Sequence, residues 1–258
     1  MDLQSLLIIL VLGALIGLAL GALGGGGSIL TVPILVYLLH LETHVAVTAS
    51  LVIVGINALV GILLHYRAGH VNLKASLLFG IYGILASYGG ARISSLIPSA
   101  ILLVLFGLLM LVIALMMIRS KAQARFAYRS WWMTVLGGLG VGLLTGFLGV
   151  GGGFLIVPAL VLFLGMSMPD AVGSSLVVIA LNSVAGVLGH LNSGALPWTL
   201  MGLFALAGLI GLLIGTRFTN LLPPERLRQI FASFVLMLGI VVLTLNIPEV
   251  FHYLKLMY

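Results

Sequence analysis

The chain repeats itself at an offset of 125 residues, and this duplication constrains its fold more than any other feature. Without a gap, 24 of the 57 positions in Gly13–Gly69 are identical to the residues 125 positions later. The shared pattern includes a tract of glycines, Gly24–Gly27 in the first copy and 149–153 in the second. Paired repeats with glycine breaks at corresponding places are typical of secondary transporters.

The composition places this duplication in a membrane. Hydrophobic residues make up 62% of the 258 positions, charged residues make up 6%, and the mean hydropathy is +1.34. Such a chain is not a water-soluble globular domain, and we expect the lipid bilayer rather than nucleic acid as its partner. Because a bilayer admits backbone mainly as helices, the composition predicts an all-α polytopic membrane protein.

Ten apolar runs follow one another along the chain. They cover residues 6–23, 29–39, 45–64, 75–91, 100–118, 133–148, 154–165, 171–189, 198–216 and 229–247. The polar linker 119–130 divides them into a first transmembrane repeat, 1–118, and a second, 131–258. We expect each repeat to contain a glycine-broken or re-entrant helical hairpin followed by three transmembrane helices.

The hairpin prediction depends on the glycine tracts. Glycine costs about 1 kcal/mol relative to alanine inside a helix, so four in succession at Gly24–Gly27 disfavour a continuous one. The runs that follow, 29–39 and 154–165, are too short to cross a bilayer comfortably and contain Pro33 and Pro158. Broken backbone in a membrane must face protein or a water-filled cavity.

The basic residues favour opposite orientations of the two repeats. With an odd number of crossings in each repeat, one side collects nine Lys and Arg residues and the other collects two, Arg92 and Lys255. The nine are Arg67, Lys74, Arg119, Lys121, Arg125, Arg129, Arg217, Arg226 and Arg228. With four crossings in each repeat, one side would collect seven Lys and Arg residues and the other would collect four. The positive-inside rule therefore predicts inverted repeats in the cytoplasmic (inner) membrane, with a cytoplasmic linker and both termini outside.

The carboxylates argue against catalysis and against a cation pump. All five lie outside the apolar runs or at their ends: Asp2, Glu42, Asp170, Glu225 and Glu249. No Ser-His-Asp set, metal-binding cluster or carboxylate pair can be assembled within the membrane. We therefore expect no enzyme activity, no metal site and no cofactor.

Neutral hydrogen-bond donors occur instead at corresponding places in both repeats. Helix starts after the glycine tracts would present free backbone N–H groups and the positive end of a helix dipole, which suit an anion. The expected substrate-binding residues are Gly24, Gly25, Gly26, Gly27, Ser28, Ser50, Asn57, Gly149, Gly151, Gly152, Gly153, Ser175 and Asn182. The alternatives are close helix packing for the glycines and interhelical hydrogen bonds for the asparagines.

Two histidines and two arginines also recur at the offset. His65 and His190 end their runs and are candidates for gating, pH sensing or contact with a passing anion. Arg92 and Arg217 end the next helix in each repeat and are candidates for attracting anions at the two mouths. Plain interfacial histidines and orienting arginines are the alternative interpretation.

On these residues the chain resembles the TauE/SafE sulfite exporter family of membrane permeases. The similarity lies in Gly-Gly-Gly-Gly-Ser-Ile-Leu-Thr-Val-Pro at 24–33, in Gly-Val-Gly-Gly-Gly-Phe-Leu-Ile-Val-Pro at 149–158, and in the recurring Asn and His residues. The resemblance implies export of small sulfur-containing or organic anions such as sulfite and sulfonates. The repeats differ at Ser28 and Gly153, so the site need not be fully symmetric.

These observations predict a secondary transporter that binds a small anion at the membrane midplane and works by alternating access. A passive anion channel, an anion importer and a membrane-embedded scaffold remain as alternatives. Assembly into a homo-oligomer is also left open.

Overall fold

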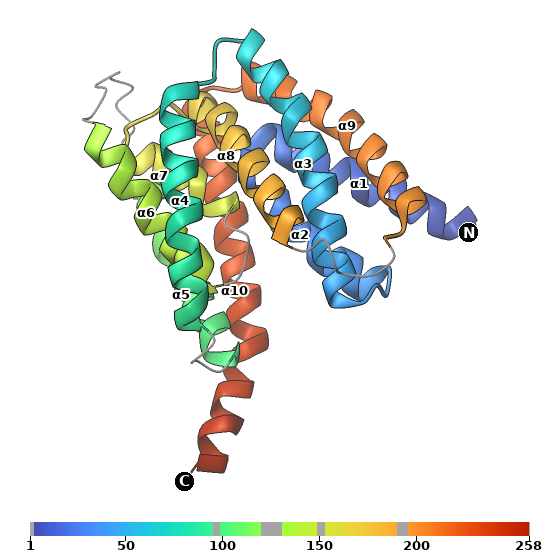
Figure 1. The fold of residues 1–258 in the computed structure, drawn as a ribbon, viewed down its shortest axis with the longest axis vertical. Helices are drawn as coiled ribbons and strands as arrows, with labels where there is room; N and C mark the ends of the chain where they lie inside the picture. The colour runs from blue at the N-terminus through green and yellow to red at the C-terminus, as the bar shows by residue number, and fades with distance from the viewer. Residues whose placement is uncertain (1–2, 95–98, 120–130, 149–152, 190–195, 258) are drawn as a thin grey trace.

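The computed structural model describes residues 3–94, 99–119, 131–148, 153–189 and 196–257, and these are almost entirely helical (Figure 1). The helices are α1 (Leu3–Leu23), α2 (Ser28–Pro33), α3 (Thr43–Arg67), α4 (Leu73–Ser94), α5 (Ser99–Arg119), α6 (Trp131–Leu148), α7 (Gly153–Leu162), α8 (Met168–Gly189), α9 (Trp198–Leu221) and α10 (Pro224–Met257). A 3-10 turn, η1 (Gly24–Gly26), and a π-helical turn, η2 (Ile34–Leu38), flank α2. Six helices, α1, α3, α5, α8, α9 and α10, are long and apolar enough to span a membrane. The predicted all-α, multi-pass membrane fold is confirmed.

Each apolar run corresponds to one helical segment, and the largest difference in extent is in α10. This helix begins at Pro224 rather than at 229, and the N–H of Leu227 already bonds to the carbonyl of Pro223 at 3.1 Å. Proline favours the first position of a helix, and backbone hydrogen bonding continues through polar residues that hydropathy leaves out. Apart from Arg119, the predicted linker 119–130 lies outside the described residues.

The two halves exchange helix partners in a matched way. α1 packs along α9 and α6 packs along α4, with α3 and α8 between these pairs (Figure 1). A methyl group added to Gly13 of α1 would lie 2.8 Å from the carbonyl oxygen of Phe204, and one added to Gly138 of α6 would lie 2.6 Å from that of Phe79. At the offset of 125 residues, Gly13 corresponds to Gly138 and Phe79 corresponds to Phe204, so the two contacts are equivalent. Such an exchange is what an approximate two-fold relation between the halves produces.

The correspondence extends to the turns that end the short helices. His40, after η2, and Gly165, after α7, both adopt the left-handed conformation, with φ of 53° and 67°. In each case the next residue donates its N–H to a carbonyl six positions earlier, at Leu35 and Leu160, over 3.1 Å. The repeated sequence therefore folds into repeated local structure. The inverted orientation of the halves across the bilayer stays a prediction.

The two short helices differ in how far they are buried. Every residue of α7 from Gly153 to Val161 is buried, and the ring of Phe154 meets the ring of Phe106 on α5 edge-on at 5.1 Å. The α2–η2 segment is more open, since Pro33 and Tyr37 are exposed. The two halves thus follow a similar chain path, but their short helices differ in burial.

We predict that Gly17→Ala on α1 and Gly142→Ala on α6 destabilise the protein by about 1–3 kcal/mol each. A methyl group at either position overlaps the backbone of the partner helix, at Gly208 and Gly83 respectively. Thermal unfolding in detergent measures the effect. Gly140→Ala on α6 is the control, since a methyl group there meets nothing within 4 Å and alanine favours the helix. Equal melting temperatures for all three variants would refute the matched packing.

Candidate anion-binding site

The first glycine tract interrupts the helix, as the sequence predicts. α1 ends at Leu23, and Gly24 has φ of 66°, a left-handed conformation that glycine adopts without steric cost. Helical structure resumes at Ser28 and continues to Leu38 through η2. At about 1.5 Å per residue this segment is about 16 Å long, about half of a hydrocarbon core of about 30 Å. It is a half-helix and cannot cross the bilayer.

The second tract is described only at its edges. α6 ends at Leu148 and α7 begins at Gly153, while residues 149–152, with the predicted site residues Gly149, Gly151 and Gly152, lie outside the described part of the chain. α7 has 10 residues and is therefore about 15 Å long. It is a second half-helix.

The structure brings the two tracts into contact with each other. A methyl group added to Gly25 would overlap the carbonyl of Gly153, and one added to Gly153 would overlap the hydroxyl of Ser28. One added to Gly24 would meet the hydroxyl of Ser175 on α8. Five of the predicted substrate-binding residues thus meet where the broken segments of the two halves cross.

The polar groups at this crossing are backbone amides and two hydroxyls. Ser28 Oγ donates to the carbonyl of Gly25 at 2.7 Å, and Ser175 Oγ donates to the carbonyl of Val172 at 2.7 Å. Gly27, which precedes α2, has no side chain with which to cap the helix start. The crossing therefore combines the start of α2, which no side chain caps, with two hydroxyls whose protons are donated to backbone carbonyls. An uncapped helix start offers N–H groups that suit an oxyanion.

Not every glycine of the first tract faces this crossing. A methyl group on Gly27 would meet the carbonyl of Ile16 at 2.5 Å and the amide of Leu20 at 2.7 Å, both on α1. Gly27 therefore lets α2 fold back closely onto α1, so the close-packing interpretation holds at this position.

The break leaves the last carbonyls of α1 without helical partners, and two neighbouring helices satisfy them. Thr219 Oγ1 on α9 donates to the carbonyls of Gly21 at 3.0 Å and Ala22 at 3.3 Å. His65 Nε2 on α3 lies 3.2 Å from the same Gly21 oxygen, a contact that requires the Nε2–H tautomer. His65, predicted as a gating residue, is fully buried and ties α3 to the broken end of α1.

Sequence reasoning missed Thr219. The position 125 residues earlier is Ser94, so a hydroxyl recurs at the end of this helix in both repeats. That recurrence is the signal that could have identified Thr219.

The structure places the asparagines on the two central helices, α3 and α8. Asn57 on α3 is fully buried and faces Gly208 of α9. Neither Asn57 Nδ2 nor Oδ1 has a hydrogen-bond partner among the described residues. Ser50, on the same helix, is buried, and Asn182 on α8 is partly buried.

The predicted anion-attracting arginines are both exposed. Arg92 donates to the hydroxyl of Tyr88 at 2.7 Å and stacks on its ring, and Arg217 lies on the outer face of α9. His190 lies outside the described residues. Among the described arginines, Arg228 of α10 is the buried one, and its position in the sequence indicated only a role in orientation.

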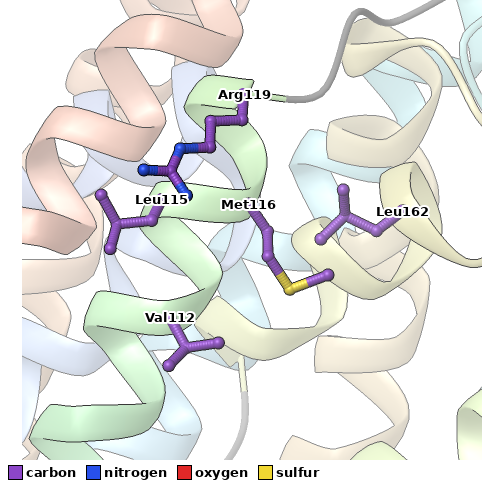
Figure 2. Close-up of a pocket in the computed structure, with 5 residues that line it drawn as sticks. All are labelled: Val112, Leu115, Met116, Arg119 and Leu162. Carbon is purple, nitrogen blue, oxygen red and sulfur yellow. The ribbon is translucent and has the colours of Figure 1, made fainter.

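A cavity of about 500 Å³ lies between α5 and α7, away from the crossing (Figure 2). It is lined by Val112, Leu115, Met116, Arg119 and Leu162. Met116 and Leu162 approach each other across it, with Arg119 at the end of α5 (Figure 2). None of the predicted site residues in the described part of the chain lines this cavity, whose wall is apolar apart from Arg119.

We predict that Thr219→Val lowers stability by about 1–3 kcal/mol, because it removes a buried hydroxyl donor from the carbonyls of Gly21 and Ala22 and leaves only His65, among the described side chains, to reach Gly21. Thermal unfolding in detergent is the measurement. Thr244→Val on α10 is the matched control, since Thr244 is exposed and bonds only within its own helix, to Val241. Its effect should stay within about 0.5 kcal/mol. Equal losses in the two variants would show that Thr219 does not support the broken helix.

Comparison with known proteins agrees with this architecture. The sulfite exporter TauE/SafE family matches residues 9–242. A probable membrane transporter protein of Xylella fastidiosa (strain 9a5c) is 35% identical, over 94% of this chain and 97% of that protein. YdhB of Bacillus subtilis (strain 168), also a probable membrane transporter protein, is 30% identical over 87% of this chain and 94% of its own length. No solved structure matches. The chain therefore belongs to the sulfite exporter TauE/SafE family and is a membrane transporter.

Proposed function

We propose that this transporter exports small organic or sulfur-containing anions, of the sulfite or sulfonate type, across the cytoplasmic membrane. The observation that carries the proposal is the contact between Gly25 of the first half and Gly153 of the second. Two broken segments meet inside a membrane protein there, and their helix starts supply N–H donors without any carboxylate. The family name supports sulfite as one substrate.

Transport requires the two tracts to separate. Gly25 and Gly153 are in contact, so an anion that binds between them displaces one segment from the other. Because the halves pack in a matched way, movement of either half opens a corresponding route on its own side. Alternating access then results from which half has moved.

The membrane potential can drive this export without a coupling ion. An inside-negative potential favours the exit of an anion by about 2.3 kcal/mol per charge per 100 mV. Of the described carboxylates, Glu42 and Glu225 are exposed, and Asp170 is held by His70 at 2.9 Å and by Ser167 at 2.6 Å at the start of α8. None of these three is placed as a sodium ligand or a proton relay.

Two alternatives from other classes give different measurements. A passive channel would give single-channel currents, whereas a carrier gives saturable, slow exchange. An importer would use the same site with net flux in the other direction, because the gradients and not the fold set that direction.

We predict that sulfite efflux from proteoliposomes increases when valinomycin and potassium make the interior negative, since net negative charge leaves. Efflux is measured as loss of internal sulfite, with protein-free liposomes as the control. Efflux that is unchanged by the imposed potential would contradict electrogenic export.

We also predict that Gly153→Ala slows sulfite efflux by about tenfold or more, on the basis that misplacement at a site costs about that much. The added methyl group meets the Ser28 hydroxyl, whereas the remaining contacts, with Gly25, are 3.2 and 3.4 Å. The double variant Ser28→Gly/Gly153→Ala removes that clash and should recover much of the flux. Gly202→Ala on α9, with nothing within 4 Å, is the control. A normal rate of sulfite efflux in Gly153→Ala would show that transport does not depend on the crossing.

A further inference from the structure

Arg228, in the second turn of α10, is a buried cation that forms no ion pair with a described residue. Only 8% of the residue is exposed. Its Nε and Nη1 have no hydrogen-bond partner in the described chain. Glu225, three positions earlier, is exposed, and no ion pair joins it to Arg228 in the part of the chain that the structure describes.

The position of Arg228 on α10 directs it into the protein. Phe231, Ala232 and Val235 follow it at helical spacing and are all buried, whereas its neighbour Arg226 is exposed. Arg228 thus belongs to the inner face of the helix.

The start of α10 lies close to the broken end of α1. Leu227 and Phe231, on either side of Arg228 along the helix, belong to the same buried cluster as Ala22 and Leu23, the last residues of α1 before the glycine tract. Thr219, which bonds to α1, lies just before the turn that leads into α10 at Pro224. α10 also contacts α1 directly, so Arg228 lies on the inner face of a helix that packs into the same core as the broken end of α1.

The chain gains no stability from this charge by itself. A guanidinium cannot be deprotonated in a protein, and an unpaired buried charge is strongly unfavourable. The N-terminal end of α10 adds the positive end of a helix dipole, which increases the unfavourable potential instead of offsetting it. The corresponding position in the first repeat is Leu103, which is exposed, so the buried charge belongs to the second repeat alone.

We propose that Arg228 binds the transported oxyanion, a sulfite, sulfonate or carboxylate, beside the first glycine tract. This inference rests on the proposed function and identifies the residue that supplies the positive charge. A guanidinium offers several N–H donors to an oxyanion, and charge-assisted hydrogen bonds are the strong ones. The positive-inside rule predicts that this end of α10 faces the cytoplasm, where an exporter captures its substrate.

The test compares Arg228→Met and Arg228→Lys with Arg226→Met, which removes the same charge from the exposed face of the same helix. Each purified protein is titrated with sodium sulfite and with sodium methanesulfonate, against sodium chloride at equal ionic strength, and its thermal unfolding is followed. The same proteins are then assayed for sulfite efflux from proteoliposomes.

We expect both oxyanions to raise the melting temperature of the wild type and of Arg226→Met. Arg228→Met should fold with an unchanged or higher melting temperature in chloride, because an apolar residue replaces an unpaired charge. Its apparent affinity for oxyanions should fall by about tenfold or more. Arg228→Lys keeps the charge but not the planar donors, so its affinity for oxyanions should lie between that of the wild type and that of Arg228→Met.

The outcomes separate this inference from the proposed function. If Arg228→Met responds to oxyanions as the wild type does, the inference is wrong while export of anions can stand. If the wild type carries no sulfite but its stabilisation by oxyanions depends on Arg228, export is wrong and the binding site stands. If neither oxyanion stabilises the wild type, the inference is wrong.

Discussion

The structure depends on one constraint: a helix broken inside a bilayer must have its freed backbone groups satisfied by protein. The break at Gly24 meets this constraint from several directions. Thr219 and His65, from two different helices, reach the carbonyl of Gly21, and Ser28 closes the tract on itself through the carbonyl of Gly25. The irregular backbone is therefore fixed by long-range contacts between α1, α3 and α9. In the proposed site, the surrounding helices rather than side chains of the tract would hold the glycine amides in place.

The departure from symmetry at Ser28 and Gly153 has a physical explanation at the crossing of the tracts. These residues correspond in the two repeats, yet they touch each other, because both lie where the halves meet. A side chain that fills this space from one half leaves no room for the same side chain from the other. Duplicated proteins meet this restriction close to a two-fold axis, where corresponding residues become neighbours. The sequence difference thus reflects steric exclusion, and it leaves exact symmetry impossible at the centre.

Much of the fold followed from the sequence, because hydropathy and glycine act locally. Apolar runs predicted the helices, and four glycines in succession predicted the break at Gly24. What the sequence could not show depended on tertiary neighbours. The spacing of Ser50 and Asn57 predicts that they share a face of α3, but it does not show that Asn57 packs against Gly208 of α9. The burial of Arg228 was missed because the predicted apolar run begins at 229, after several polar residues. The helix in fact begins earlier, at Pro224. Burial of a charge is a property of the packed helix and not of its composition.

The matched path of the two halves and their unequal side chains have different consequences for transport. A chain with identical halves would have two conformations of equal free energy and equal affinity on both sides of the membrane. Here Asp170, held by His70, corresponds to Val45, and the buried Arg228 corresponds to Leu103, so charge is placed in only one of each pair. α7 is also fully enclosed where α2 is partly exposed. Under the proposed alternating access, these differences would make the two conformations unequal in free energy. The direction of net transport would still follow the gradients, while the asymmetry would set the side on which an anion is bound more tightly.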